Sequence, residues 1–437
     1  MLKLQSQEEW AQRAAEVLPG AGFGNFDPSI FIREGKGARV VDEDGRWYID
    51  YLIGSGPMIL GHGHPEVLEA VYEQLPRGMT FFANSTPGVE LAEEIVRAMA
   101  CAEQVRYVCT GSEADMYAMR LARAATGRPK IVKFEGGYHG MSNEAQMSLA
   151  PTRLANFPEG IMDSAGLPES LHRDVLVAPF NDPDFAISLM AEHGHEIAAI
   201  IVEPLQRIVP PEPGFLEALR ALCDSHGALL IFDEVVTGFR FAYGGAQELY
   251  SVTPDICTLG KVIGGGFPLA AIAGRRDIMR HFDKAAVGAE GWLMQLGTLS
   301  GNPVAAVAGL KTMEILRRDG QYERFRATGE RLQQSLSAAL DAQGVPHRVV
   351  GDPTLFDVVF ADAPVRNYRD TIAGDAAAAR RFNAALRAEG ILKPPSKFYL
   401  SLALGEEELS ETEAAFAVAA RAAARAATQG VDTTGAG

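Results

Sequence analysis

Residues 228–240, Ala-Leu-Leu-Ile-Phe-Asp-Glu-Val-Val-Thr-Gly-Phe-Arg, open with an unbroken apolar run that stops at Asp233. Another apolar run, Ala198-Ala-Ile-Ile-Val202, precedes it in the chain. Continuous apolar runs are typical of strands buried on both faces, as in a parallel sheet between two layers of helices. The stretch therefore predicts an α/β fold built on a mainly parallel sheet.

Helical and strand patterns alternate on both sides of this stretch, from about residue 65 to residue 318. We expect seven strands, at 104–109, 130–134, 175–179, 197–202, 228–232, 255–258 and 269–273. We expect helices at 65–75, 88–100, 112–126, 183–193, 214–226 and 303–318. This alternation predicts one large α/β domain over residues 65–318.

The two ends of the chain differ from this pattern, and we expect them to form a smaller α+β domain together. The N-terminal segment, residues 1–64, is expected to hold a helix at 6–18 and a hairpin with strands at 38–41 and 47–51. The C-terminal segment, residues 319–437, is expected to end in a loose polar tail at 429–437. Its expected elements are helices at 321–342, 377–389 and 408–427 and strands at 347–350, 354–360 and 398–403.

Composition limits the classes of function. The chain has 437 residues, 47% of them hydrophobic and 22% charged, and a formal net charge of −16. The acidic excess opposes binding to nucleic acid or to an anionic membrane. No apolar run approaches the roughly 20 residues of a membrane span, and the first ten residues lack the apolar core of a signal peptide. The four scattered cysteines favour buried thiols, so we expect a cytoplasmic protein.

Lys261 lies in Thr-Leu-Gly-Lys-Val-Ile-Gly-Gly-Gly-Phe-Pro, residues 258–268, after a further short apolar stretch. The triple glycine at 264–266 indicates close approach of the backbone to something, which argues against an ordinary solvated lysine. Lys261 and Asp233 suit pyridoxal 5′-phosphate. The amine can form a Schiff base with the cofactor aldehyde, and the acid can hold the pyridine nitrogen protonated. A structural helix cap is the alternative for Asp233.

Three further segments could hold such a cofactor, and each has an ordinary structural alternative. Cys109-Thr-Gly-Ser112 stands between a strand and a helix, where free N–H groups bind phosphate or where a serine caps the helix. Tyr138, in a Gly-Gly-Tyr-His-Gly turn, could stack on a heterocycle or pack as a core tyrosine. Thr298, shortly before a helix, could bind a phosphate or belong to a plain turn.

Signals for other cofactors are missing. His62 and His64 are close in sequence but lack the partners of a zinc site, so we expect no metal. Neither the Gly-x-Gly-x-x-Gly pattern of dinucleotide-binding proteins nor the phosphate loop Gly-x4-Gly-Lys-Ser/Thr occurs.

In this order, the segments resemble the class III aminotransferases of fold type I, over about residues 30–425. Within that class the chain is most similar to the glutamate-1-semialdehyde aminomutases and related transaminases, through residues 55–62, 237–245 and 252–276. The resemblance implies pyridoxal 5′-phosphate as cofactor. It also implies a large domain with a seven-stranded sheet and a smaller domain from the two ends of the chain.

The resemblance implies roles around the cofactor ring. Lys261 forms the Schiff base and later moves a proton. Asp233 pairs with the pyridine nitrogen, and Tyr138 and Val235 lie on opposite faces of the ring.

It also implies roles at the cofactor's other groups. Gly111 and Ser112 bind the phosphate, and Gln206 approaches the ring hydroxyl. Thr298 of the partner subunit reaches the same phosphate, which makes a homodimer the minimal active unit.

Departures from the family concern the substrate. The aminomutases carry a substrate-binding arginine near the N-terminus, whereas residues 20–26 here contain none. Ser55 lies in a segment that lacks the family's aromatic residue, and Trp292 could narrow the pocket. Lys397 falls where some β-amino-acid transaminases carry a carboxylate-binding arginine; the alternative is a surface lysine.

We therefore expect a transaminase that moves an amino group from an amino acid or amine to a keto acid, ketone or aldehyde. One alternative is an aminomutase or racemase on the same scaffold, which needs no external acceptor. Another is a non-catalytic cofactor-binding protein, against which the presence of both Lys261 and Asp233 argues.

Overall fold

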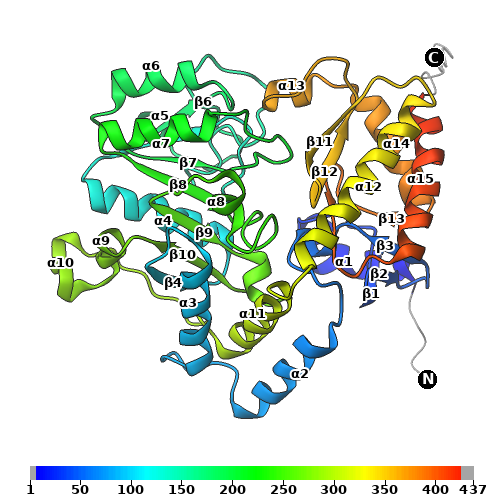
Figure 1. Cartoon of the computed structure of the whole chain (residues 1–437), viewed down its shortest axis with the longest axis horizontal. Coiled ribbons are helices and arrows are strands. Elements are labelled where there is room, and N and C mark those ends of the chain that lie inside the picture. The colour runs from blue at the N-terminus through cyan, green and yellow to red at the C-terminus, as the bar shows by residue number, and fades with distance from the viewer. Residues whose placement is uncertain (1–5, 425–437) are drawn as a thin grey trace.

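A seven-stranded sheet forms the centre of the computed structural model, which describes residues 6–424 (Figure 1). The strand order is β4-β10-β9-β8-β7-β5-β6. β10 runs antiparallel to both of its neighbours, and the remaining pairs are parallel. The predicted α/β fold with a mainly parallel seven-stranded sheet is confirmed. The strands are β4 (Gln104–Val108), β5 (Lys130–Phe134), β6 (Val175–Ala178), β7 (Ile197–Val202), β8 (Leu229–Glu234), β9 (Ile256–Leu259) and β10 (Ala270–Gly274).

Helices cover both faces of this sheet. α4 (Gly111–Thr126) packs on one face with Ile231 of β8, and α7 (Phe215–His226) shares a separate core cluster with Phe232. Side chains alternate along a strand, so Asp233 points to the α4 face. The other helices of this region are α2 (Pro65–Gln74), α3 (Thr86–Ala98), α5 (Leu171–Asp174), α6 (Pro183–His193), α8 (Gly245–Tyr250), α9 (Arg276–Met279), α10 (Lys284–Gly291) and α11 (Pro303–Leu316).

A second sheet joins the two ends of the chain. Its order is β1 (Ile32–Lys36), β2 (Arg39–Asp42), β3 (Trp47–Asp50) and β13 (Ile391–Leu392), and β13 pairs in parallel with β3. The predicted hairpin corresponds to β2 and β3. β1 and β13 were not predicted, because β13 is too short to show a periodic pattern and β1 is mostly exposed.

The C-terminal segment adds a third sheet and a layer of helices (Figure 1). The predicted strand at 398–403 is wrong beyond Tyr399, because the chain turns away and Leu402 donates its N–H to the carbonyl of Ile59 at 2.7 Å. Residues 425–427 of the last predicted helix and the predicted tail at 429–437 lie outside the described residues. The elements are α12 (Gln321–Asp341), β11 (Arg348–Asp352), β12 (Leu355–Val359), α13 (Tyr368–Ile372), α14 (Ala376–Ala388), β14 (Phe398–Tyr399) and α15 (Glu406–Ala424), and the N-terminal helix is α1 (Gln7–Val17).

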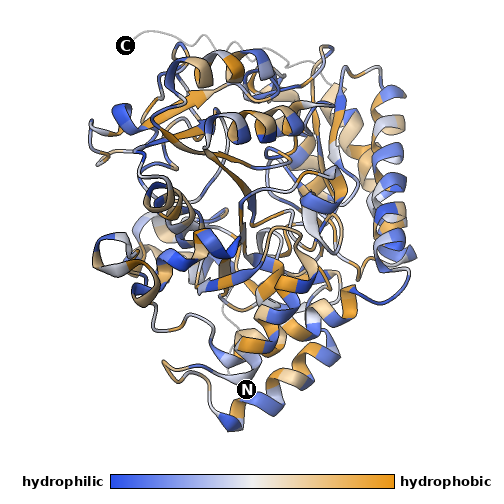
Figure 2. Ribbon diagram, turned by 60° about the vertical axis from the view of Figure 1, so that its left-hand side comes forward, coloured by the Kyte–Doolittle hydropathy of each residue, from blue (hydrophilic) through white to orange (hydrophobic). Residues whose placement is uncertain are grey.

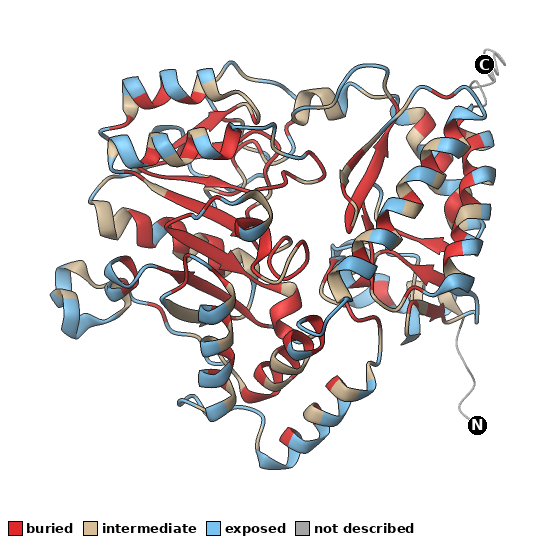
Figure 3. Ribbon diagram, viewed as in Figure 1, coloured by how far each residue is buried: buried red, intermediate tan, exposed pale blue. Residues whose placement is uncertain are grey.

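Burial follows hydropathy through the fold. Figure 2 shows apolar residues along the central strands and on the inner sides of the helices, and Figure 3 shows the same strands almost wholly buried. All four cysteines are free thiols, three of them buried and Cys109 half-buried. Within residues 6–424 no helix combines the length and apolarity that a membrane crossing requires. The boundaries at 64/65 and 318/319 remain our proposal for the domain division.

Candidate active site

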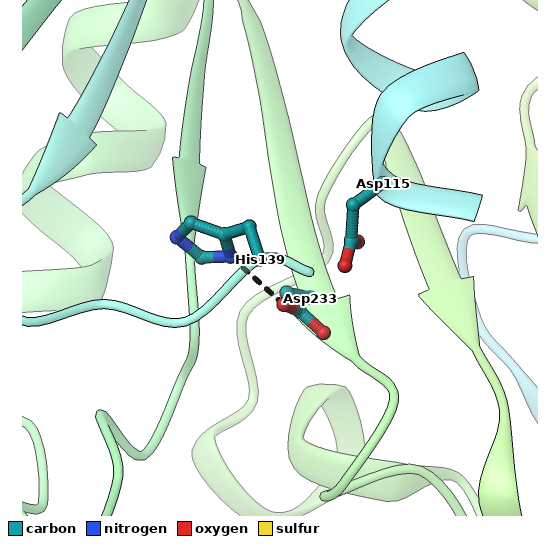
Figure 4. A group of neighbouring side chains, drawn as sticks. All are labelled: Asp115, His139 and Asp233. Carbon is teal, nitrogen blue, oxygen red and sulfur yellow. Dashed lines mark hydrogen bonds and ion pairs between the residues drawn. The ribbon is translucent and has the colours of Figure 1, made fainter. Parts of the chain in front are cut away.

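Asp233 stands at the carboxyl end of β8 among buried polar groups (Figure 4). Its Oδ2 lies 2.8 Å from His139 Nδ1, and its Oδ1 accepts the N–H of Val235 at 3.1 Å. Asp115 approaches from α4, and Thr258 Oγ1 donates to Asp115 Oδ1 at 2.5 Å. None of these acids is more than 4% exposed. Asp233 is thus no helix cap, but a carboxylate held in a closed polar cluster.

Lys261 follows β9 in a strained turn. Its backbone φ is +49°, a left-handed value that few residues other than glycine adopt. Gly265 packs so closely on α11 that a Cβ there would lie 2.6 Å from the backbone of Ala308. The close approach that the triple glycine predicted is therefore to α11, which holds the turn in place. The half-buried Lys261 side chain lies beside Gly56, where a Cβ would be 3.3 Å from Lys261 Cδ.

The N-terminus of α4 is capped by Thr110, not by Ser112. Thr110 Oγ1 accepts the Glu113 N–H, and the Glu113 carboxylate accepts the Thr110 N–H. Ser112 instead lies against the turn after β5, because a Cβ at Gly140 would come within 2.5 Å of Ser112 Oγ. The predicted phosphate cradle at Gly111 therefore lies next to the predicted stacking segment.

Val235, just after β8, contacts two segments that are distant in the sequence. A Cβ at Gly111 would lie 2.8 Å from Val235 Cγ1, and a Cβ at Gly260 would lie 3.2 Å from the same atom. The end of β8, the start of α4 and the Lys261 turn therefore meet at one point.

The turn that carries Tyr138 is held near these segments by hydrogen bonds to residues that follow β7. The Tyr138 N–H donates to Glu203 Oε2 at 2.8 Å, which fixes the turn against the end of β7. The guanidinium of Arg207 lies 5.1 Å from the centroid of the Tyr138 ring. Gln206 Nε2 donates to the carbonyl of Glu135 at 2.8 Å, which orients the Gln206 side chain toward the same turn.

A cluster of positively charged side chains surrounds Tyr399 next to Lys261. Tyr399, from β14, is buried, and a Cβ at Gly56 would lie 3.2 Å from its ring. Lys397 is 5% exposed, so it is no surface lysine, and its Nζ lies 5.7 Å from the Tyr399 ring centroid. Ser55 hydrogen-bonds the Tyr399 phenol. The structure thus brings the predicted substrate residues Ser55 and Lys397 to the neighbourhood of Lys261.

Arg240 supports the backbone around Tyr399 from the interior of the protein. It is fully buried and donates to the carbonyl oxygens of Gly56 at 2.7 Å and Leu400 at 3.0 Å. Its guanidinium also lies 5.5 Å from the Tyr399 ring centroid. One side chain from the large sheet region therefore fixes the loop before α2 and the strand that carries Tyr399.

The Tyr399 phenol is expected to ionise early in the cofactor-free protein. Burial raises its pKa most, but the charges of Lys397, Lys261 and Arg207 and the hydrogen bond from Ser55 together lower the pKa from 10.0 to about 8. The phenol loses its proton more easily in the folded state than in the unfolded state. The free energy of unfolding should therefore increase as the pH rises from about 8 to about 10.

An ultraviolet phenolate titration of the cofactor-free protein measures this ionisation. One early-titrating tyrosine is expected, absent in Tyr399→Phe and moved to higher pH in Lys397→Met. An identical early phase in Tyr399→Phe would contradict the assignment. Other tyrosines should ionise only at higher pH, because burial raises their pKa. They are Tyr51, Tyr107, Tyr250 and Tyr322.

Two predicted residues take no part in the contacts described so far. Thr298 is exposed, and its carbonyl accepts a hydrogen bond from Thr80 Oγ1 at 3.4 Å. Trp292 follows the end of α10, where the Lys284 ammonium lies 5.1 Å from its ring centroid. Their predicted roles in phosphate binding and pocket shape stay predictions.

Several side chains of the site had no role in the sequence analysis, among them Asp115, His139 and Tyr399. Asp115 gives a signal, since it is an acid on the apolar face of the helix that begins at Gly111. His139 gives a weaker one, next to Tyr138. Tyr399 gives none, because it reaches Ser55 only through the folding of β14.

The region that holds these contacts matches a known family. A family model, Aminotransferase class-III, matches residues 24–409. The chain belongs to the class-III aminotransferases. This membership confirms the predicted family and makes the protein an enzyme that uses pyridoxal 5′-phosphate.

Named relatives of this class-III chain differ in activity. It is 42% identical over 389 residues, 88% of this chain and 89% of the relative, to glutamate-1-semialdehyde 2,1-aminomutase 2 of Brevibacillus brevis. The crystal structure of an omega-transaminase from Sphaerobacter thermophilus matches with a TM-score of 0.90 and 34% identity, over 97% of this chain and 98% of that one. A transaminase with the cofactor bound matches with a TM-score of 0.87 and 33% identity, over 95% and 97%.

The residues at the site fit the cofactor of the family. His139 Nε2 and Gln206 Oε1 are buried and have no hydrogen-bond partner in the part of the chain that the structure describes. Both atoms converge on Gly137, where a Cβ would lie 3.1 Å and 3.5 Å from them. Buried polar atoms without partners are costly, so a polar ligand beside the Tyr138 turn would satisfy them.

Proposed function

We propose that this class-III enzyme is an aminotransferase that moves an amino group from an amino acid or amine donor to a keto acid, ketone or aldehyde acceptor. The convergence of Lys261 with Asp233 at one buried point carries the proposal of cofactor chemistry. Bound pyridoxal 5′-phosphate would supply an electron sink for breaking bonds at the amino-bearing carbon. Solved structures named as transaminases, at 33% and 34% identity, support transfer between two molecules.

Lys261 and Asp233 act at opposite ends of the cofactor ring. Lys261 Nζ would hold the cofactor through its aldehyde carbon and would then be placed to move a proton at the amino-bearing carbon of the substrate. Asp233, fixed by His139 and by the Val235 N–H, holds the pyridine nitrogen in its protonated form. Tyr138 and Val235 would pack on the two faces of the ring.

The phosphate end is served by a helix terminus. The backbone N–H groups at Gly111 and the hydroxyl of Ser112 stand at the start of α4, where the helix dipole favours an anion. Gln206 would meet the ring hydroxyl with its Oε1, which lacks a partner within residues 6–424.

The charges beside Lys261 favour a substrate with a carboxylate. Lys397 and Arg207 both act on the Tyr399 phenol, which places two further cations next to Lys261. The nearby acid, Glu203, is engaged by the Tyr138 N–H. Amino acids, including β-amino acids, are therefore better donors in this proposal than simple amines.

An aminomutase is the second candidate, because the relative from Brevibacillus brevis carries that name. The lack of an arginine in residues 20–26, where the resembled aminomutases bind their substrate, favours the transaminase. A mutase or racemase would rearrange one amino compound and would consume no keto acid.

The half-reaction with a panel of donors separates these functions. A transaminase donor converts the bound cofactor to its amine form and bleaches the visible band, and a keto acid restores the band. Rearrangement of one compound without an acceptor would establish the mutase instead. Lys397→Met is expected to raise KM for carboxylate donors by about tenfold, the effect of one lost charged contact. KM for an uncharged amine serves as its control.

We also propose a homodimer with shared active sites, working in the cytoplasm. Exposed apolar side chains gather in the two segments that the Thr80–Thr298 hydrogen bond joins. They are Met79, Phe81, Phe82, Met294, Leu296 and Leu299. Such a surface fits burial against a second copy of the chain, with Thr298 of the partner subunit near the phosphate.

Mixed dimers test the shared site. Lys261→Ala and Thr298→Ala chains are expected to be impaired when alone, whereas refolding them together should restore about a quarter of the activity in a random mixture. The restored site combines Lys261 of one chain with Thr298 of the other. No restoration, or a monomer in sedimentation, would contradict the proposal.

A further inference from the structure

Asp115 belongs to the polar cluster around Asp233, yet the proposed function gives it no role (Figure 4). It projects from α4 toward the sheet and is 2% exposed. Its neighbours on that helix face, Ala114, Ala118 and Met119, are buried and apolar. An acidic side chain in such a place is costly unless it has partners of its own.

Thr258 holds Asp115 close to Asp233. Thr258 Oγ1 donates to Asp115 Oδ1 at 2.5 Å, and Thr258 is the residue of β9 that pairs with Asp233 of β8. Oxygen and nitrogen atoms of Asp115, His139 and Asp233 all lie within 4.8 Å of one another. Asp233 already accepts from His139 and from the Val235 N–H. Asp115 stands where a further donor to Asp233 would stand.

We propose that Asp115 is a positioning residue that keeps a proton and donates it in a hydrogen bond to Asp233. The two carboxyl groups then carry one negative charge between them, because two adjacent buried carboxylates repel each other too strongly for both to ionise.

Burial and the charge of Asp233, in that order, raise the pKa of Asp115 well above its ordinary value. The other titratable groups that face Asp115 are His139 and Tyr138 from the turn after β5 and Glu203 from the end of β7. Glu203 adds negative charge and acts in the same direction.

The consequence for the cofactor rests on the proposed function. Asp233 would face the pyridine nitrogen with one negative charge and with its oxygens fixed by three donors. Asp115 would therefore set both the orientation of Asp233 and the strength with which the ring nitrogen holds its proton.

Infrared spectra of the cofactor-free protein test the proton itself. Wild type minus Asp115→Asn should show the carbonyl stretch of a protonated carboxyl group. Asp255→Asn is the matched control, a buried aspartate of the same sheet region that forms ion pairs with Arg220 at 2.8 Å and Arg275 at 2.6 Å. Its difference spectrum should lack that band. A missing band in the Asp115 difference spectrum overturns the proposal.

The cofactor-loaded protein tests the positioning role. Asp115→Asn keeps a donor toward Asp233 and should leave the cofactor Kd within about threefold, whereas Asp115→Ala should weaken it by about tenfold. The pH midpoint of the visible cofactor band should move in Asp115→Ala and stay in Asp115→Asn. Equal effects of the two variants, or none in either, overturn the role.

Two controls separate other outcomes. Thr258→Val removes the hydroxyl that contacts Asp115 but leaves both carboxyl groups in place, so its spectrum should keep the band of the protonated carboxyl. This variant tests the same proton without changing position 115, in case Asp115→Asn does not fold. Stoichiometric Zn²⁺ binding by the cofactor-free wild type, lost in Asp115→Asn, would mark a metal site and overturn the proposal. If the wild type shows no visible cofactor band, the proposed function fails, while the infrared band still decides the protonation of Asp115.

Discussion

Replacing Lys261 with alanine is expected to abolish the visible band of the bound cofactor and to lower kcat by at least about a thousandfold. The reason is geometric as well as chemical. The left-handed backbone at Lys261 and the packing of Gly265 on α11 hold the turn that carries this amine, and Gly260 of the same turn lies against Val235. Lys261 is the only lysine in the turn at 258–268, so no other amine from this turn can take its place.

Absorbance and single-turnover measurements check this result. Lys397→Met is the matched control: Lys397 is also a buried lysine next to Tyr399, but it should keep the visible band. Retention of both the band and turnover in Lys261→Ala would remove Lys261 from the chemistry. Equal loss in the two variants would point to a general collapse of the pocket.

Replacing Asp233 with alanine is expected to lower kcat by about a hundred- to a thousandfold, or about 2.7–4 kcal/mol, in line with the loss of one preorganised charged partner. Asp233 contributes a fixed carboxylate, since His139 and the Val235 N–H hold both of its oxygens. The ring nitrogen would lose its anionic partner and the ring would draw electrons less strongly.

The absorbance spectrum and kcat of Asp233→Asn, which keeps the shape but not the charge, separate charge from packing. Asn should be as damaging as Ala, because the charge is what the ring nitrogen needs. Asp255→Asn provides a buried aspartate variant outside the site, and its kcat should stay near wild type. Full activity in Asp233→Asn would refute the role given to Asp233.

The central sheet was predictable because its information is local. Unbroken apolar runs mark β7 and β8, and the alternation along β8 then places Asp233 on the α4 face. The turn at Lys261 and the cap region of α4 also carry local glycine and hydroxyl signals. The cofactor half of the site therefore follows from short stretches of sequence, each tied to the end of a predicted strand.

The substrate half was less predictable, since it depends on contacts between distant segments. Tyr399 comes from a two-residue strand, and its neighbours Ser55 and Gly56 come from the other end of the chain. Asp115 escaped attention because helix periodicity alone does not show that its face meets Asp233. The roles of Thr298 and Trp292 remain predictions, because within residues 6–424 neither residue forms a hydrogen bond or ring contact with the segments that meet at Val235.

The pairing of β13 with β3 bears on how the protein is made. Ile391 pairs with Ile49, so most of the chain must leave the ribosome before β3 gains its neighbour. Until then β3 has an open edge, which other chains can join. Contacts between such distant residues also form slowly. Nascent chains that stop before residue 391 should therefore expose β3, lack Tyr399 beside Lys261, and depend on chaperones to stay out of aggregates.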